Sequence, residues 1–181
     1  MIKLLHSADW HLDAPMSGHS EEETQRLRKE LRKIPEKIAK LCKAENCDLM
    51  ILAGDLFDGP YTKESLTAVR TALESVKIPV IITPGNHDPY TPSSPYARLT
   101  WPSHVHIFTS PYPERVDLPH LGAVVYGSAF LSPHRVDSPL LDLQAQDEGL
   151  ISFGCFHGDT STPFSRYGPI TQEEIARCGL D

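Results

Sequence analysis

Residues 49–55 read Leu-Met-Ile-Leu-Ala-Gly-Asp, a short apolar run that ends in a glycine and a carboxylate. Two other apolar runs, Leu4-Leu5 and Val80-Ile81-Ile82, are each followed by a segment rich in metal ligands, Asp9-Trp10-His11 and Gly85-Asn86-His87-Asp88. Short apolar runs bounded by turn residues are typical of buried strands. Ligands of an open α/β sheet bind just beyond the carboxyl ends of its strands. The pattern therefore predicts that these polar side chains converge at one edge of a sheet.

Helical segments separate the three predicted strands. The capping-box sequence 20–23 predicts a helix start, followed by apolar residues at helical spacing, namely Leu27, Leu31, Ile34, Ile38 and Leu41. We expect one face of this helix to pack on the sheet. Pro35 removes a backbone hydrogen bond, so the pattern predicts either a kink or two helices that meet near residue 34.

Thr62 predicts the N-cap of another helix, which continues to about Val76 and leads into a strand at 79–83. With the strand at 48–53, the order is βαβαβ, and right-handed crossovers make the first three strands parallel. The Pro-rich stretch 89–102 has no clear period, which indicates a surface loop beside the site. We expect this loop to contribute to substrate binding.

The second half of the chain predicts short strands, at 105–108, 114–118, 123–126 and 150–157. We expect all four to form a second sheet that packs against the first. A further capping box at 171–174 predicts a last helix, which Gly179 would end.

The ordered motifs Asp-x-His, Gly-Asp and Gly-Asn-His-Asp, followed by the lone His157, resemble the calcineurin-like metallophosphoesterase superfamily. The amino-acid sequences of segments 6–12, 54–58 and 84–88 are similar to those of the Mre11/SbcD-type DNA repair nucleases. Segment 12–15 is most similar to their bacterial YhaO-type branch. The resemblance covers nearly the whole chain. It implies an α/β fold, a four-layer α/β/β/α sandwich, with residues 1–181 forming one nuclease domain. The Gly-His-x-His motif that ends the family pattern is absent, so the expectation is a domain that lacks its C-terminal portion.

The resemblance also assigns the metal ligands. Asp9 and His11 would belong to one metal, Asp55 would bridge, and Asn86 and His157 would belong to the second. Mixed oxygen and nitrogen donors with a neutral amide suit Mn²⁺, Fe or Zn²⁺. The resembled nucleases point to two Mn²⁺ ions as the cofactors.

His87 matches the family histidine that contacts the phosphate and acts as the catalytic residue in the transition state. The roles of Asp58, Asp88 and Asp159 stay open between contacts to the ligands and plain turn carboxylates. Taken singly, every motif is compatible with an ordinary turn, and it is their joint order after strands that favours a metal site. Six further histidines are read as structural or surface residues: His6, His19, His104, His106, His120 and His134.

Composition and net charge narrow the class of protein further. A chain of 181 residues that is 40% hydrophobic fits one domain with a real core. Four cysteines without CxxC spacing and the absence of a signal peptide or membrane span predict a soluble cytoplasmic protein. The net charge of −7 has the wrong sign for a generic nucleic-acid binder, and the basic residues of 26–43 alternate with glutamates as on a solvated helix face.

The leading interpretation is a metal-dependent phosphodiesterase or nuclease that acts on DNA in repair. Its partners by resemblance would be DNA and an SbcC/Rad50-like ATPase, with a homodimer as a further candidate assembly. One alternative keeps the chemistry but takes a small-molecule phosphate ester as substrate. Another is an inactive metal-binding fragment.

Overall fold

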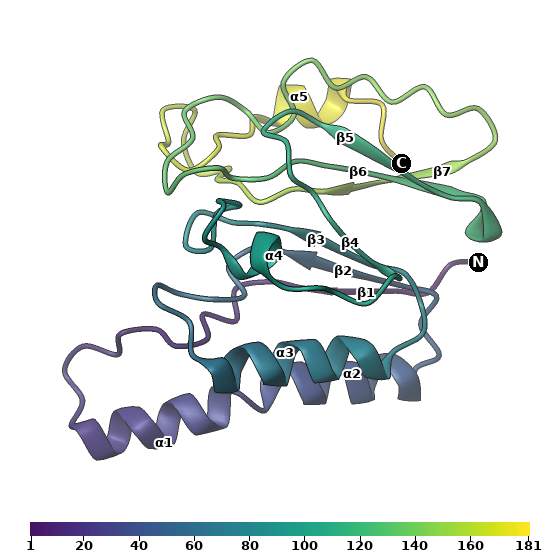
Figure 1. Cartoon of the computed structure of the whole chain (residues 1–181). Helices are drawn as coiled ribbons and strands as arrows, with labels where there is room; N and C mark the ends of the chain where they lie inside the picture. Colours follow the sequence, from purple (N-terminus) through teal and green to yellow (C-terminus); the bar gives the residue numbers. More distant parts are fainter.

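Two β-sheets packed face to face form the centre of the computed structural model, which describes residues 1–181 (Figure 1). The first sheet has four parallel strands in the order β1-β2-β3-β4, with bounds Leu4–Ser7, Leu49–Ala53, Val80–Thr83 and Val105–Ile107. Because parallel strands follow one another in sequence order, crossovers of one hand place their helices on a single face. Helices α2 (Ile34–Ala44) and α3 (Lys63–Ser75) cover that face.

The position of β2 between two cores explains why its sequence is apolar without alternation. Met50 and Leu52 belong to the core beneath the helices, whereas Leu49, Ile51 and Ala53 belong to the core between the sheets. A central parallel strand is buried on both faces and therefore reads as a continuous hydrophobic run.

The break near residue 34 is confirmed as two helices. Helix α1 (Glu21–Leu31) ends before α2 begins, and Pro35 lies in the first turn of α2, where its missing N–H costs nothing. The expectation that the whole apolar stripe packs on the sheet was wrong for α1, because none of its residues is buried and it extends beyond the sheet (Figure 1). The turn at 32–33 interrupts the stripe, so the stripe reaches the core through Leu31 at the end of α1 and through α2.

The second sheet contains β5 (Glu114–Leu118), β6 (Ala123–Gly127) and β7 (Ile151–Cys155). Strands β5 and β6 are antiparallel and are joined through a 3₁₀ turn, while β7 runs parallel to β6. The prediction that residues 105–108 belong to this sheet was wrong, since β4 pairs with β3 in the first sheet. The stretch 89–102 is long enough to act as a parallel crossover, and a strand's own residues do not specify which sheet it joins.

The outer layer of the second sheet is thin. It consists of α5 (Gln172–Arg177), which starts with the predicted capping box, and the adjoining loop, with Leu140, Leu143 and Cys178 as a small core. The α/β fold and the α/β/β/α order of layers are confirmed (Figure 1). None of the helices has both the length and the apolar composition of a membrane span.

Candidate metal centre

The carboxyl ends of β1, β2 and β3 turn sharply and meet at one edge of the first sheet. Asp9, His11 and Asp55 all have positive φ values, 56°, 45° and 54°, in a region that aspartate tolerates better than most residues. The Asp9 N–H donates to the Gly54 carbonyl at 3.0 Å, and the His11 N–H donates to the Asp55 carbonyl at 3.0 Å. These bonds hold the first two loops side by side.

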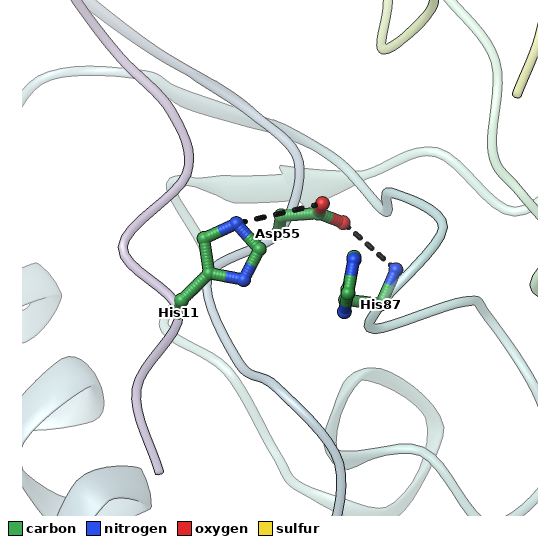
Figure 2. Close-up of side chains that lie close together, drawn as sticks. All are labelled: His11, Asp55 and His87. Atoms are coloured by element: carbon green, nitrogen blue, oxygen red, sulfur yellow. Dashed lines mark hydrogen bonds and ion pairs between the residues drawn. The ribbon is translucent and has the colours of Figure 1, made fainter. Parts of the chain in front are cut away.

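Asp55 lies at the centre of the site and is 2% exposed (Figure 2). Its Oδ1 accepts a hydrogen bond from the His87 backbone N–H at 2.9 Å. Its Oδ2 lies 3.9 Å from Nε2 of His11 and 3.5 Å from Nε2 of His157. The loops can approach this closely only with glycine at position 85, because a Cβ there would lie 2.1 Å from Asp55 Oδ1.

Two groups of donor atoms share Asp55. In one, ligand atoms of Asp9, Asp55 and His157 lie within 4.8 Å of one another, and in the other, ligand atoms of His11, Asp55 and His87 do. Asn86 adds its Oδ1 atom, 3.0 Å from His157 Nε2. The structure thus places His87 beside the residues that the sequence analysis proposes as metal ligands. It brings all five of these together, namely Asp9, His11, Asp55, Asn86 and His157.

His157 comes from the second sheet, directly after β7. Its Nδ1 lies 2.9 Å from the Ala53 carbonyl oxygen, and the Phe130 ring packs edge-on against it at a centroid distance of 5.6 Å. An Nδ1–H that donates to a carbonyl leaves Nε2 unprotonated and directed toward Asp55 and Asn86. This is the arrangement that a metal-ligating imidazole requires.

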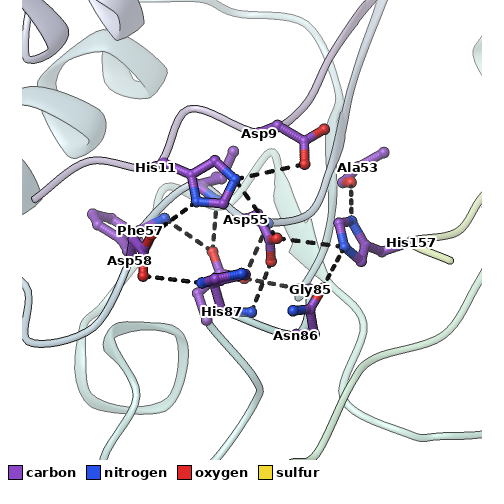
Figure 3. A network of polar contacts seen from close by, with 12 residues as sticks. Asp9, His11, Ala53, Asp55, Phe57, Asp58, Gly85, Asn86, His87 and His157 are labelled. Atoms are coloured by element: carbon purple, nitrogen blue, oxygen red, sulfur yellow. Dashed lines mark hydrogen bonds and ion pairs between the residues drawn. The ribbon is translucent and has the colours of Figure 1, made fainter. Parts of the chain in front are cut away.

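Asp58 contacts both imidazoles of the other donor group (Figure 3). Its Oδ2 lies 3.1 Å from Nδ1 of His11, and its Oδ1 lies 3.0 Å from Nδ1 of His87. Burial lowers the pKa of His87, but the hydrogen bond to Asp58 and the nearby carboxylates, Asp55 first, outweigh this and raise the pKa above its ordinary value. Asp58 therefore orients two rings and favours a protonated His87.

Asp88 has a different role from Asp58. Its carboxylate is buried and accepts five hydrogen bonds, from the backbone N–H groups of Asp55, Leu56, Phe57 and Gly85 and from the Tyr96 hydroxyl. Burial raises the pKa of Asp88 to about 6, although the hydrogen bonds from Tyr96 and the backbone act against this. Asp88 thus fastens the loops after β2 and β3 to each other.

Tyr96 belongs to the Pro-rich stretch that the sequence analysis reads as a surface loop. That interpretation was incomplete, because the stretch contains the short helix α4 (Pro95–Arg98) and Tyr96 is buried. Asp159 is partly exposed and lines the cavity, and its Oδ1 accepts a hydrogen bond from the Ser161 N–H at 2.8 Å. It makes no hydrogen bond with the candidate ligands, and its backbone pairs with Pro169 in an isolated bridge, so its carboxylate caps a local turn.

The donor set fits a divalent cation. Asp55 is a buried carboxylate whose only ionisable side-chain partners are histidines, with no lysine or arginine within ion-pairing distance. A buried carboxylate requires a compensating positive charge. Carboxylate, amide and imidazole donors without a thiolate suit Mn²⁺, Fe or Zn²⁺, and the cavity of about 770 Å³ in front of them is open to solvent. His6, which the sequence analysis reads as structural or surface, also lines this cavity.

Residues 2–175 match the calcineurin-like phosphoesterase family. The chain belongs to this family. Members of the family use divalent metals, in agreement with the donor groups around Asp55. The confirmed family and the Asp-x-His, Gly-Asp and Gly-Asn-His-Asp order support a metal-dependent hydrolase.

The chain is similar to two kinds of curated protein. The "uncharacterized metallophosphoesterase YhaO" of Bacillus subtilis (strain 168) is 27% identical over 194 residues, which cover 99% of this chain and 47% of that protein. The SbcD component of the nuclease SbcCD from Staphylococcus epidermidis is 33% identical over 92 residues, 48% of this chain and 23% of that protein. The SbcD component from Staphylococcus saprophyticus matches to the same extent. The chain therefore spans about half the length of YhaO, and its match covers less of the SbcD proteins.

Proposed function

We propose that this chain is a metal-dependent phosphodiesterase domain of the nuclease type that acts on DNA. The observation that carries the proposal is the Asp55 carboxylate, which is shared by two groups of donor atoms as the bridging ligand of a two-metal site would be. Asp9 and His11, whose Oδ1 and Nε2 atoms lie 3.8 Å apart, would hold one ion, and Asn86 and His157, whose Oδ1 and Nε2 atoms lie 3.0 Å apart, would hold the other. This pairing differs from the two donor groups around Asp55, in which Asp9 is grouped with His157 and His11 with His87. Residues 1–181 would act as one domain, since the ligands come from both sheets.

The ions would supply Lewis-acid neutralisation of the phosphoryl oxygens and activation of water. Among the ions that the donors suit, Mn²⁺ is the proposed one, with Fe or Zn²⁺ as alternatives. The protein's own contribution is orientation. Asp58 fixes the ring planes of His11 and His87, the Ala53 carbonyl fixes His157, and Asp88 fixes the distance between two ligand loops.

His87 is the proposed catalytic residue. Its side chain is 44% exposed at the mouth of the site, while Asp58 holds its Nδ1 and raises its pKa. A protonated imidazole held in this way can donate a hydrogen bond to a phosphoryl oxygen and give a proton to the leaving oxygen. The alternative role is that of a metal ligand, because the ring also lies within reach of His11 and Asp55.

DNA is the proposed substrate because part of the chain is similar to the SbcD component of the nuclease SbcCD. An SbcC/Rad50-like ATPase is the proposed partner on the same ground, with a homodimer as a further assembly and DNA repair as the process. A cytoplasmic location is supported by the four cysteines, all of them free and buried as is ordinary in a reducing compartment.

A small-molecule phosphodiester or phosphate ester is the second candidate substrate. No lysine or arginine is found among the residues that line the cavity. Extended nucleic-acid backbones are usually held by such cations. A small ester needs fewer charge contacts, so this observation favours it.

The experiment compares substrates on the same Mn²⁺-loaded protein. Hydrolysis of both a labelled single-stranded oligonucleotide and a chromogenic phosphodiester, lost in Asp55→Asn but kept in the exposed control Asp142→Asn, supports the nuclease proposal. Hydrolysis of the small ester alone supports the second candidate. Stoichiometric Mn²⁺ binding without hydrolysis of either substrate contradicts both and leaves a metal-binding domain.

A further inference from the structure

A second, smaller cavity lies next to the candidate metal centre. Its volume is about 160 Å³, and His87 is the residue that it shares with the cavity of about 770 Å³ in front of the donor groups. In Figure 3, Phe57, which lines the smaller cavity, lies on the side of His87 away from His157. His87 therefore stands between the space in front of the donor atoms and the smaller cavity.

The walls of the smaller cavity suit an uncharged group. The rings of Phe57 and Tyr61, with centroids 6.1 Å apart, line it, and Pro89 and Pro95 add apolar ring surface. No lysine or arginine lines the cavity, and its one carboxylate, that of Asp88, already accepts five hydrogen bonds. A charged group placed here would find no opposite charge to pair with, which makes its burial costly.

Three hydroxyl groups give the smaller cavity hydrogen-bonding capacity. Ser94 is 6% exposed, its Oγ accepts from the Thr91 N–H at 3.3 Å, and it makes no capping bond to α4, so its own O–H has no acceptor in the chain. The Oγ1 of Thr91 and the Oγ of Ser93 lie 3.1 Å apart and share one hydrogen bond, which leaves one O–H free. Buried hydroxyls are normally satisfied. The free O–H of Ser94 therefore indicates a polar ligand in the cavity.

The segment that carries these hydroxyls is fixed to the rest of the protein. The Tyr61 hydroxyl donates to the Ser93 carbonyl at 2.7 Å, and the Ser94 N–H donates to the Thr91 carbonyl at 3.0 Å. A cavity that is formed before binding costs little conformational entropy when a ligand enters it.

We propose that the smaller cavity is a leaving-group subsite, which holds the uncharged ring on the leaving oxygen of the phosphodiester, in DNA a deoxyribose. This inference rests on the proposed function, because it places the phosphate at the Asp55 centre. In hydrolysis a water oxygen bonds to phosphorus while the bond to the leaving oxygen breaks in line with it, and that oxygen takes a proton from His87. The group on the leaving oxygen then points away from the donor groups and past His87.

The size of the smaller cavity agrees with this occupant. At ~30 Å³ per water, a volume of about 160 Å³ corresponds to about five waters, which is the size of one small ring. The free hydroxyls can bond to the ring oxygen and hydroxyl groups of a sugar, and the aromatic rings can cover its apolar face.

The first test needs neither metal nor turnover. Titration of the metal-free protein with methyl 2-deoxyriboside, followed by amide NMR, should shift the resonances of Thr91, Ser93 and Ser94 but not those of residues 159–161 in the other cavity. Ser93→Trp should weaken this binding at least ~10-fold, because the indole fills the space. Ser103→Trp is the matched control, since Ser103 is also exposed but lies outside the cavity. Absence of the shifts in wild type, or equal binding by Ser93→Trp, would overturn the proposal.

The second test compares leaving groups of different size on the Mn²⁺-loaded protein. Methyl p-nitrophenyl phosphate and methyl 4-methylumbelliferyl phosphate release phenols of similar acidity, but the first leaves as one ring and the second as two fused rings. Wild type should have a KM at least ~10-fold lower for the one-ring ester. Tyr61→Ala, which removes a wall, should narrow this difference by lowering KM for the larger ester, and Ser93→Trp should raise KM for the one-ring ester.

Equal KM values for the two esters in wild type, or an unchanged difference in a folded Tyr61→Ala protein, would contradict the subsite. If wild type hydrolyses neither ester, the proposed function fails, and the NMR titration still decides whether a sugar ring binds in the smaller cavity.

Discussion

The Nδ1 atom of His157 lies 2.9 Å from the carbonyl oxygen of Ala53, so an imidazole that follows β7 of the second sheet is hydrogen-bonded to the last residue of β2, an inner strand of the first. This contact fixes the distance between the two sheets at the candidate metal centre. Removing the ring therefore removes a proposed ligand and a contact between sheets together.

We expect His157→Ala to lower the Mn²⁺ content of the purified protein, because one proposed donor of the second ion is lost. Loss of a ligand or of its supporting contact typically weakens metal affinity ~10–100-fold. Elemental analysis after equilibrium dialysis measures the change. His134→Ala is the control, since His134 contacts Tyr167 and not the donor groups. Equal Mn²⁺ content in His157→Ala and wild type would show that His157 is not a ligand.

His87→Ala is expected to keep its metal while losing most of its activity, because a residue that acts in the transition state affects turnover more than occupancy. General acid–base help of this kind is worth ~10²–10⁴ in rate. Asp55→Ala, by contrast, should lose metal and activity together. The measurements are metal content and hydrolysis of a chromogenic phosphodiester. If His87→Ala loses metal as completely as Asp55→Ala does, His87 is a ligand instead.

Gly85→Ala should disturb the centre without removing any donor. The added Cβ would meet Asp55 Oδ1 at 2.1 Å, and the Asp55 carboxylate would have to move. We expect reduced Mn²⁺ binding, measured by calorimetry. Ala68→Gly on α3 is the control, because it changes a small residue outside the candidate metal centre. Gly149→Ala is not used, because Gly149 has a positive φ of 79° and the substitution would itself strain the backbone. Wild-type Mn²⁺ affinity in Gly85→Ala would contradict the close packing of these loops.

Asp88→Ala should destabilise the fold by roughly 3–5 kcal/mol, because it leaves several buried N–H groups without an acceptor. Tyr96→Phe removes one of the five donors and should cost about 1 kcal/mol. Urea unfolding of the metal-free proteins measures both changes. A loss below about 1 kcal/mol in Asp88→Ala would mean that the two loops are held by other contacts.

Asp13 should contribute to the pH dependence of stability. Burial raises its pKa, but hydrogen bonds from Thr62, Ser65 and Arg32 outweigh burial and hold the pKa below its ordinary value. The folded state thus favours the ionised form, so the stabilisation is present above the pKa of the unfolded chain, ~4, and is lost as pH falls through the lower folded pKa. Urea unfolding should show a stability gap between wild type and Asp13→Asn that narrows on acidification. A gap that widens would contradict this sign.

The local sequence was sufficient to predict most of the helices and strands and most of the candidate site residues. The run at 49–55 predicted β2 and its terminal carboxylate, Pro35 predicted the boundary between α1 and α2, and the strand-then-ligand order predicted that Asp9, Asp55 and Asn86 meet. These features depend on strand burial, helix capping and the common edge of parallel strands, all of which are encoded within a few neighbouring residues.

Only the tertiary structure decided which sheet β4 joins, that most of α1 extends beyond the sheet, and how the three aspartates near the ligand motifs divide their roles. Asp58, Asp88 and Asp159 look alike in sequence, yet one orients imidazoles, one fastens loops and one caps a turn. Each role depends on partners distant in the chain or on the path of one loop. Long-range packing likewise brings Tyr167 to the cavity wall. Periodicity and motifs report what a residue's own segment does, whereas long-range packing decides what that residue touches.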